Sequence, residues 1–370
     1  MKPRERVRRA FSHLETDRPP VDFGATVVTC MDYHAYKNLK AYLGINVDDG
    51  AIIDHTMGTV EPCERIKQLF GADFRRVSMN YAAPDIQNGR FTNGFGIVFK
   101  KAGRHEYYDV VYNPLEDADI SEIEHMRLPD PDDAALYYGI TDKAKGLYEN
   151  SAYSIVADFG VPGFYETSQK LRGYENLACD LLTEPEFVKA LYDRLLELQM
   201  RYFKNYMRCV GKYADVVCYA DDLGMQDRPQ ISPETYRRVI KPYHKAIFSY
   251  IHTLTDAKIL LHSCGAIAPL LGDLIDAGVD IINPVQIRSA GMAPDILKRD
   301  FGKDIIFWGG MDEQEILPRG TPEEVAGEAA RLVRILGEGG GYVFAPSHNF
   351  QQDTPPRNIE AMYAWVKTEP

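Results

Sequence analysis

The chain has 370 residues, of which 45% are hydrophobic and 26% are charged, and this composition excludes a disordered or collagen-like protein. Acidic residues outnumber lysine and arginine by 54 to 42, so the formal net charge is -12 and no global positive field attracts nucleic acid or anionic lipid. The basic N-terminus lacks the apolar run of a secretory signal, and nowhere do about 18 apolar residues follow one another. We therefore expect a cytoplasmic globular protein without a membrane or nucleic-acid partner.

The first predicted elements are a helix and a short strand near the N-terminus. Val7, Ala10, Phe11 and Leu14 recur at helical spacing, so we expect an amphipathic helix whose arginines form its solvated face. The segment VDFGAT at 21–26 is then a candidate strand.

Residues 27–150 differ in pattern from the rest of the chain. They contain irregular, tyrosine-rich and proline-punctuated segments and a predicted hairpin in RFTNGFGIVFKK, residues 90–101. We expect this region to form an insertion or lid and not barrel repeats. Some of its tyrosines could wall an aromatic pocket, although aromatic side chains also fill cores routinely. The four candidates are Tyr33, Tyr36, Tyr81 and Tyr107.

From residue 150 onward one pattern repeats. A short apolar run rich in Val, Ile, Phe or Tyr is followed by a polar or glycine-bearing end and then by an amphipathic stretch long enough for a helix. Ser232-Pro233 and Thr321-Pro322 mark the starts of two of these helices. The six candidate strands are SIVADFG (154–160), DVVCYADDLG (215–224), KILLHSCG (258–265), DIINPVQ (280–286), DIIFWGGMD (304–312) and GYVFAPSHN (341–349).

Strands that alternate with helices predict a parallel sheet. Six such units, with one or two more upstream, suggest eight strands, and we predict an α/β fold, a (β/α)8 TIM barrel with an elaborated N-terminal region. A single domain spans residues 1–370 in this interpretation, with residues 27–150 as its N-terminal insertion or lid. The main competitor is an open doubly wound sheet, which is disfavoured because no GxGxxG sequence follows the first strand.

Polar residues follow one predicted strand after another. Because the chemistry of a barrel sits at the carboxyl ends of its strands, we expect these side chains to converge there. Desolvating so many polar groups costs free energy unless they are paired or hydrated, which favours a functional site. Each single aspartate could instead cap the following helix or close a turn. The residues concerned are Asp158, Asp221, Asp222, His262, Cys264, Asn283, Gln286, Asp312, His348 and Asn349.

The pair His262 and Cys264 is the sharpest chemical signal among them. Residues two apart on a strand point to the same face, and an imidazole beside a thiolate suits zinc. His348 ends a later strand and could supply a third ligand, which leaves one open position as in a catalytic zinc site. Asp221 or Asp222 could be a fourth ligand or an acceptor that orients an imidazole. The alternative is a buried histidine bonded to the backbone beside a packing cysteine.

Four segments of the chain carry a family resemblance. They are RERVRRAFSHLETDRPPVDFG, DDLGMQDRPQISPETYRRVIKPYHKAI, HSCGAIAPLLGDLIDAGVDIINPVQ and APSHNFQQDTPPRNIEAMY. These segments resemble the uroporphyrinogen decarboxylase superfamily, and more specifically its corrinoid-dependent methyltransferase branch. The resemblance covers nearly the whole chain and is loosest over residues 27–150. It implies a TIM barrel, in agreement with the count of predicted strands.

The two branches of this superfamily require different residues. The decarboxylases use no metal or cofactor, and they grip the carboxylates of a porphyrinogen with an arginine-rich N-terminal motif and carry a histidine that His348 matches. Here the segment TVVTCMDYHAYKNLKAYLG contains no arginine, so decarboxylation is disfavoured. The methyltransferases bind zinc through His-x-Cys, which His262 and Cys264 match, and through a later cysteine. In this chain His348 takes that later position, and a site with one thiolate is the stronger Lewis acid.

The resemblance therefore implies a zinc-dependent methyltransferase of the O-demethylase type. It would transfer a methyl group between a small methoxylated substrate and the corrinoid of a separate corrinoid protein, because no corrinoid-binding region is visible in the sequence. We expect Zn2+ on His262, Cys264 and His348, with Asp158, Asp222 or a tyrosine as the candidate catalytic proton donor. The candidate substrate-binding residues are Asp221, Asn283, Gln286 and Asn349.

Two other hypotheses stay open at this point. One is a metal-free uroporphyrinogen decarboxylase-like carboxy-lyase that acts on a tetrapyrrole. The other is a catalytically inert barrel that binds a corrinoid protein or a small ligand. The sequence identifies neither the methyl donor nor the direction of transfer, and it leaves a homodimer open.

Overall fold

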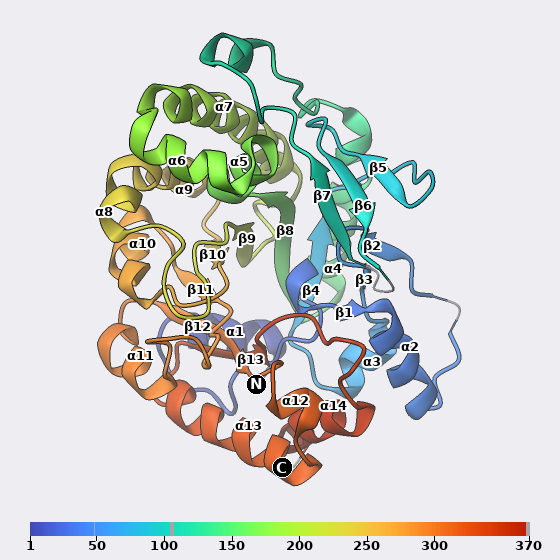
Figure 1. Ribbon diagram of the computed structural model, residues 1–370. Coiled ribbons are helices and arrows are strands. Elements are labelled where there is room, and N and C mark those ends of the chain that lie inside the picture. The colour runs from blue at the N-terminus through green and yellow to red at the C-terminus, as the bar shows by residue number, and fades with distance from the viewer. Residues whose placement is uncertain (48, 104–106, 368–370) are drawn as a thin grey trace.

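The computed structural model describes residues 1–47, 49–103 and 107–367, and a parallel sheet of seven strands forms its centre (Figure 1). Each strand predicted after residue 150 is present in this sheet, so that part of the prediction is confirmed. In spatial order the strands are β13 (Tyr342–Pro346), β12 (Ile306–Met311), β11 (Ile281–Asn283), β10 (Lys258–His262), β9 (Val216–Ala220), β8 (Ser154–Pro162) and β4 (Phe74–Ser78).

A short segment near the N-terminus closes the barrel. Val21 forms a parallel bridge with Phe344 of β13, and its carbonyl oxygen accepts the N–H of Asp73, directly before β4, at 2.8 Å. These contacts join the two edges of the sheet and supply the eighth position of a (β/α)8 TIM barrel. The strand predicted at 21–26 is wrong beyond its first residue, because Gly24 has a φ of 83° and turns the chain out of the extended conformation.

One barrel strand lies inside the region expected to be an insertion. β4 belongs to residues 27–150 and pairs in parallel with β8 along its whole length, so the expectation does not hold for this strand. Its sequence FRRVS lacks the continuous apolar run that marks the other strands, which is why the pattern missed it. Both arginines are buried against carboxylates, Glu64 for Arg75 and Asp158 for Arg76.

Helix α1 (Pro3–Phe11) covers the N-terminal end of the barrel. Its predicted apolar face is confirmed for Val7, Ala10 and Phe11, which are buried, whereas Leu14 lies beyond the helix and is exposed. Val7 and Phe11 belong to the same apolar cluster as the inward side chains of the barrel strands. The helix therefore plugs the barrel at this end, and Figure 1 shows it behind the strands.

One arginine of α1 departs from the expected solvated face. Arg6 is buried, and its guanidinium group donates to the Asp17 carboxylate at 2.7 Å and to the Asp73 carboxylate at 2.5 Å. Arg18 donates to the second oxygen of Asp73 at 2.8 Å, and Asp73 is fully buried. The burial of these charges is tolerated because each has an opposite partner. We call Arg6, Asp17, Arg18 and Asp73 the N-terminal charge cluster.

Helices cover the outside of the barrel between successive strands. Two predicted helix starts are confirmed, since the Ser232 hydroxyl accepts the Thr235 N–H and Thr321 forms a capping box with Glu324. A π-helical turn, Tyr236–Ile240, joins α8 to α9. Among the described residues, no helix combines the length and the apolarity needed to cross a membrane. The helices after β4 are α4 (Ile140–Asn150), α5 (Phe164–Arg172), α6 (Tyr174–Thr183), α7 (Pro185–Val210), α8 (Pro233–Thr235), α9 (Lys241–Leu254), α10 (Leu271–Ala277), α11 (Pro294–Phe301), α12 (Ile316–Arg319), α13 (Pro322–Gly337) and α14 (Pro356–Met362).

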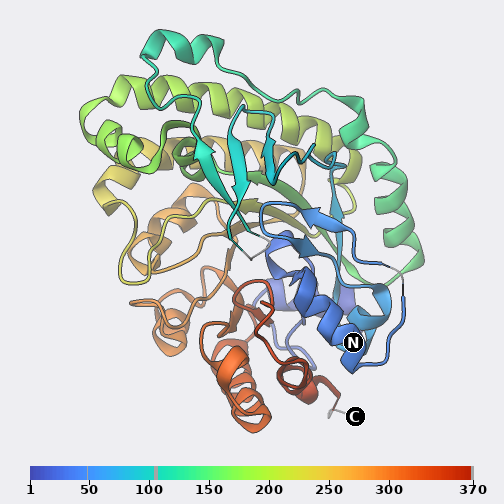
Figure 2. The same cartoon turned by 45° about the vertical axis from the view of Figure 1, so that its right-hand side comes forward.

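Two small antiparallel sheets lie outside the barrel. The predicted hairpin at 90–101 is confirmed, because β5 (Arg90–Thr92) pairs with β6 (Val98–Lys101), and β7 (Tyr108–Tyr112) extends this sheet. Figure 2, in which this side comes forward, shows β5–β7 in front of the barrel strands. The other small sheet and its neighbouring helices consist of β1 (Met31–Asp32), β2 (Ile52–Asp54), β3 (Thr59–Val60), α2 (Tyr33–Tyr42) and α3 (Glu64–Leu69).

Candidate functional site

The barrel interior changes from apolar to polar along its strands. Alternate residues of a strand share a direction, so the residue two positions beyond an inward core residue also points inward. The apolar layer near α1 contains Phe74, Val156, Leu260, Ile281 and Trp308. Further toward the carboxyl ends, the same direction is taken by Arg76, Asp158, Cys218, His262 and Asn283. The predicted polar residues therefore reach the barrel mouth by ordinary strand alternation.

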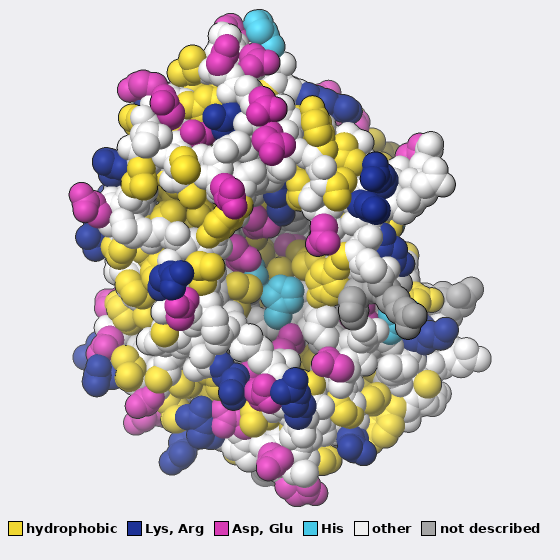
Figure 3. All heavy atoms as spheres, in the orientation of Figure 1, with side chains coloured by type: hydrophobic (Ala, Val, Ile, Leu, Met, Phe, Trp, Pro, Cys, Tyr) yellow, Lys and Arg dark blue, Asp and Glu magenta, His cyan; other side chains and the backbone are white. Residues whose placement is uncertain are grey.

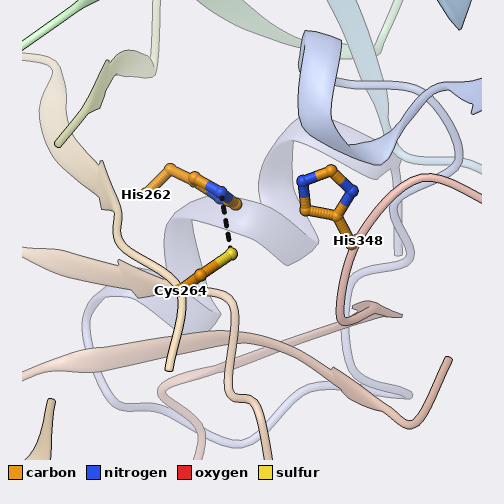
Figure 4. Close-up of side chains that lie close together, drawn as sticks. All are labelled: His262, Cys264 and His348. Atoms are coloured by element: carbon orange, nitrogen blue, oxygen red, sulfur yellow. Dashed lines mark hydrogen bonds between the residues drawn. The ribbon is translucent and has the colours of Figure 1, made fainter. Parts of the chain in front are cut away.

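Three side chains with metal-ligating atoms converge at this mouth (Figure 4). His262 Nε2 lies 3.5 Å from Cys264 Sγ, and the ring centroids of His262 and His348 are 5.5 Å apart at an interplanar angle of 62°. One ligand atom from each residue lies within 4.8 Å of the other two. His262 ends β10, Cys264 lies just after it, and His348 follows β13. The structure thus brings His348 together with His262 and Cys264, which lie in a distant part of the sequence.

Asn283 fixes the orientation of the His262 ring. Its Nδ2 donates to the Trp308 carbonyl oxygen at 3.1 Å, so its Oδ1, which lies 2.6 Å from His262 Nδ1, is the acceptor. His262 Nδ1 therefore carries the proton, and the Nε2 lone pair is directed to the space shared with Cys264 and His348. Asn283 is buried and contacts the histidine, whereas the sequence analysis assigned it to the substrate.

Side-chain acceptors hold the loop that carries Cys264. The Cys264 N–H donates to Asp222 Oδ1 at 2.8 Å, and the Gly265 N–H donates to Gln286 Oε1 at 2.8 Å. Gly265 has a φ of 90°, and a Cβ atom here would lie 2.5 Å from the Met225 carbonyl oxygen, so only glycine fits. Gln286, which was predicted to bind the substrate, and Asp222, which was predicted to be catalytic, therefore also position the thiol.

Burial sets the protonation of two of the three converging side chains. It lowers the pKa of His348 to about 3, with a further contribution from His262, so the His348 imidazole is neutral at pH 7. Neutral imidazole is the form that binds a metal ion. Burial, together with the Asp222 carboxylate, raises the pKa of the Cys264 thiol well above its ordinary value. Without a metal ion Cys264 is therefore a protonated thiol, and a divalent cation would stabilise its thiolate.

A cavity of about 380 Å³ opens at these side chains, and Figure 3 shows a hollow on this face with histidine atoms in it. Four predicted residues line it, namely Asp158, Asp222, His262 and His348. The β5–β7 sheet and its turn supply much of the apolar wall. The apolar and aromatic side chains from this sheet are Phe91, Phe95, Ile97, Phe99, Tyr107, Tyr108 and Val110.

The cavity also contains charged residues that the sequence analysis did not identify. Lys170 Nζ donates to Glu166 Oε1 at 2.6 Å on α5, and Asp54 lines the same space. A Glu-Lys pair four residues apart is ordinary on any surface helix, so no sequence signal marked it. Of the four tyrosines considered for a pocket wall, Tyr107 lines the cavity and donates its hydroxyl hydrogen to Gln351 Oε1 at 2.9 Å.

Asp158 lies between the barrel interior and the cavity. Its Oδ2 accepts from Arg76 Nε at 2.5 Å and from the Val27 N–H at 2.8 Å. Its Oδ1 is buried and has no hydrogen-bond partner among the described residues. A buried acceptor without a partner costs free energy, so this atom is available to a donor group on a ligand.

Asp221 and Asn349 do not line the cavity, although both were predicted as substrate-binding residues. Asp221 is fully buried, and its oxygens accept two backbone N–H groups at the start of α5 and lie 2.9 Å from His244 Nε2. It therefore caps the helix that carries Glu166. Asn349 is also buried, and its Nδ2 donates to the Val27 carbonyl oxygen at 2.7 Å. Both residues hold backbone segments near the cavity.

Comparison with known proteins places this site in a family context. Residues 118–369 match the family described as Uroporphyrinogen decarboxylase (URO-D). A curated relative, Methylcobamide:CoM methyltransferase MtbA of Methanosarcina acetivorans, is 29% identical over 51% of this chain and 51% of that protein. The Methylated-thiol--coenzyme M methyltransferase of Methanosarcina mazei is 26% identical over 54% of this chain and 50% of that protein. A uroporphyrinogen decarboxylase of Alkalilimnicola ehrlichii is 24% identical over 97% of this chain and 92% of that protein.

The chain spans about half the length of the two curated methyltransferases that it matches. Among solved structures, a methyltransferase from Methanosarcina mazei aligns over 98% of both chains with a TM-score of 0.66 and 19% identity, which shows a common fold. The family match covers more than half of the chain and includes His262, Cys264 and His348. The chain therefore belongs to the uroporphyrinogen decarboxylase (URO-D) family.

Proposed function

We propose that the protein is a zinc-dependent methyltransferase of the O-demethylase type. It transfers a methyl group between a small methoxylated substrate and the corrinoid of a separate corrinoid protein. The observation that carries this proposal is the convergence of His262, Cys264 and His348 at a cavity with an apolar wall. Two relatives named as methyltransferases, one of them for a methylcobamide, support the same class of reaction.

The donor set fits a zinc ion. In a tetrahedral site with ligands about 2.0–2.3 Å from the metal, two ligand atoms lie about 3.5 Å apart. His262 Nε2 and Cys264 Sγ are 3.5 Å apart, and His348 offers a neutral imidazole within 4.8 Å of both. The three residues leave a fourth position for a substrate atom. When bound, zinc would supply Lewis acidity toward the heteroatom from which the methyl group departs.

Asp158 and Asp222, two of the carboxylates that line the cavity, have different roles in this proposal. Asp222 Oδ1 lies 3.9 Å from His262 Nε2, and the Asp222 side chain is 38% exposed. A partly solvated carboxylate at this place can relay a proton from water to the departing oxygen atom. Asp158 is held as an acceptor by Arg76, so we assign its free Oδ1 to orienting the substrate.

The apolar wall suits the organic part of a methoxylated substrate. Phe91 and Phe99 of the β5–β7 sheet stack with ring centroids 4.9 Å apart, and both line the cavity. Displacement at a methyl carbon requires the methyl donor and acceptor to be in line, so a packed wall contributes by orienting the donor. It also excludes water, which strengthens the electrostatic interactions of the carboxylates and the cation position.

The same cavity does not suit a porphyrinogen with many carboxylates. Among the described residues that line it, the anionic side chains are Asp54, Asp158, Glu166 and Asp222, and Lys170 is the one lysine or arginine. A polycarboxylate would meet like charges here without the bidentate arginines that such a ligand needs. The decarboxylase hypothesis is therefore the weaker one, although a relative of nearly equal length bears that name.

Methyl transfer to a reduced corrinoid protein tests the proposal. The purified protein is mixed with a corrinoid protein in the Co(I) state and with methoxylated compounds, and the methyl-Co(III) absorption spectrum is followed. We expect this spectrum with protein that contains about one zinc per chain, its loss after chelation and its return on addition of zinc. Zinc-loaded protein that is inactive with every donor would overturn the proposal, as would a metal-free preparation that decarboxylates uroporphyrinogen.

A further inference from the structure

Three glutamine side chains from three different loops meet near the metal-ligating residues. Gln226 follows β9, Gln286 follows β11 and Gln314 follows β12. Gln226 Oε1 accepts from Gln286 Nε2 at 3.3 Å and from Gln314 Nε2 at 3.2 Å. Gln226 Nε2 donates in turn to the Arg288 carbonyl oxygen at 3.0 Å. We call Gln226, Gln286 and Gln314 the amide cluster.

The amide cluster is joined to the loop that carries Cys264. Gln286 Oε1 accepts the N–H of Gly265, the residue after the thiol, at 2.8 Å. Gln226 and Gln314 are exposed, and none of the three glutamines lines the 380 Å³ cavity. The cluster therefore belongs to the outer rim of the barrel mouth, where a macromolecular partner could reach it.

Glutamine is concentrated around this mouth. The chain has ten glutamines, and seven of them lie on α5 or on the loops after β9, β11, β12 and β13. Some of these amides also pair with one another, since Gln169 Nε2 donates to Gln230 Oε1 at 2.8 Å. The seven are Gln169, Gln226, Gln230, Gln286, Gln314, Gln351 and Gln352.

The amide cluster can make further hydrogen bonds. A primary amide has two N–H donors and one carbonyl acceptor. Within the described chain, each Nε2 atom of the cluster makes one hydrogen bond and Gln314 Oε1 makes none. Each glutamine thus retains one N–H for a partner, and Gln314 also retains its acceptor. A partner that itself carries amides matches this set, because an amide donates and accepts without charge.

The charges on the same loops disfavour an anionic partner. Their described basic residues are Arg228 and Arg288, in the loops after β9 and β11. Arg228 is paired with Asp227 at 2.6 Å, and Arg288 lies 3.8 Å from the Asp312 carboxylate. Carboxylates at the edge of a ligand would therefore find no uncompensated cation on these loops.

We propose that the amide cluster binds the acetamide and propionamide groups at the edge of the corrin ring that the partner protein carries. This inference rests on the proposed methyl transfer to a corrinoid. A corrin is a broad macrocycle edged by neutral amides, whereas a porphyrinogen is edged by carboxylates. Contact with Gln226 and Gln314 holds the edge of the ring beside the Cys264 loop, and the neutral cluster selects an amide edge over a carboxylate edge.

Equilibrium dialysis with two corrinoid probes tests this inference without catalysis. The probes are dicyanocobinamide, which keeps the peripheral amides, and dicyanocobyrinic acid, which carries carboxylates in their place. Zinc-loaded wild-type protein is compared with the double variant Gln226→Ala, Gln314→Ala. The matched control is Gln68→Ala, an exposed glutamine on α3 with one side-chain hydrogen bond, to Glu64.

We expect the wild type and the control to bind cobinamide equally and to prefer it to the carboxylate analogue. The double variant should bind cobinamide on the order of tenfold more weakly, because two hydrogen bonds are lost, and its preference should shrink. Its zinc content should equal that of the wild type. Equal affinities in all three proteins, equal binding of both probes by the wild type, or no binding of cobinamide to the wild type would each overturn the inference. If the variant behaves as expected but no methoxylated donor is demethylated, the proposed function fails while recognition of the amides stands.

Discussion

The two ends of the barrel differ in how their buried polar groups are paired. At the end covered by α1, the N-terminal charge cluster pairs its buried charges, with Asp73 between Arg6 and Arg18. At the open end, Asp158 Oδ1 and Asn349 Oδ1 are buried without a hydrogen-bond partner among the described residues. Paired groups stabilise the fold, whereas unpaired ones reduce its stability and are retained where a ligand completes them. The contrast applies to these carboxyl and amide groups, since His13 Nδ1, just after α1, is also buried without a hydrogen-bond partner among the described residues.

Two buried histidines show the same contrast at the level of single rings. The Nδ1 atom of His244 lies 3.0 Å from the Tyr236 hydroxyl and its Nε2 atom lies 2.9 Å from Asp221, so both nitrogens have partners. His262 has an amide partner on Nδ1 alone, and its Nε2 lies beside a thiol. A metal ligand needs a lone pair that a cation can take, and the Nε2 lone pair of His262 is engaged only by the weak hydrogen bond from the Cys264 thiol.

The largest expected effect is on the free energy of unfolding, and it concerns the N-terminal charge cluster. Replacing Asp73 by Asn removes a counter-charge shared by Arg6 and Arg18, and the loss of one partner from a buried ion pair costs about 3–5 kcal/mol. We expect Asp73→Asn to lower the free energy of unfolding by this amount in urea titrations, with the zinc content per folded chain unchanged. As a control, Asp132→Asn breaks an exposed pair with Arg201 and should lose far less stability. Similar losses of stability in both variants would show that the buried charge cluster stabilises the fold no more than an exposed ion pair does.

The next largest effect concerns two cysteines of the barrel interior. We expect Cys264→Ala to weaken zinc binding by more than about 100-fold, since loss of a ligand exceeds the roughly 10- to 100-fold cost of losing its hydrogen-bond partner. Cys218→Ala is the matched control, because Cys218 lines the cavity but lies outside the group of metal-ligating residues. Elemental analysis after dialysis against a graded zinc buffer measures both affinities. Retention of zinc by the Cys264 variant would contradict the proposed centre.

A third prediction concerns a carboxyl group in the apolar layer between the two ends. Burial raises the pKa of Asp22 to about 6, and the Asp22 carboxylate accepts from Trp308 Nε1 at 2.8 Å. The folded chain therefore binds this proton more tightly than the unfolded chain. The stability that this gives is complete below about pH 4 and is lost as the pH rises through about 6.

The variant Asp22→Asn isolates this contribution, because asparagine does not titrate. We expect the free energy of unfolding of the wild type, relative to the variant, to fall by about 2 kcal/mol between pH 4 and pH 7. Urea titrations at several pH values measure the difference, in which the titration of all other groups cancels. A difference that is constant with pH would show that the carboxyl group of Asp22 is not perturbed.

The smallest of the four effects tests the residue that orients His262. We expect Asn283→Ala to weaken zinc binding on the order of tenfold, because the ring loses the acceptor that fixes its Nδ1 proton. Asn358→Ala is the control, since the Asn358 side chain on α14 is also buried and donates to two backbone carbonyl oxygens, those of Leu317 and Gly320, which do not belong to the metal-ligating residues. The control should lose stability and keep its zinc affinity. Equal zinc affinities in both variants would reduce Asn283 to a packing residue.

The amino-acid sequence by itself determined the repeated part of the fold. The six strands after residue 150 and the hairpin at 90–101 were predicted because apolar runs and turn residues act within a few positions of each other. The prediction that His262 and Cys264 point to the same face also rests on local sequence, since strand residues alternate between faces. The glycine after Cys264 is required for a different reason, since a Cβ atom there would meet the Met225 carbonyl oxygen of another loop.

Only the tertiary structure decided which partner each polar residue meets. Asp221 and Asp222 are neighbours in sequence, yet one caps α5 and the other lines the cavity. From the sequence alone, Arg6 was expected on the solvated face of a helix, and Arg76 interrupted the apolar pattern of a strand. In the structure Arg6 is paired with Asp73 and Arg76 with Asp158, and both carboxylates are distant along the chain. The physical reason is that a buried charge is tolerated only beside its partner, and that partner is set by chain topology and not by neighbouring residues.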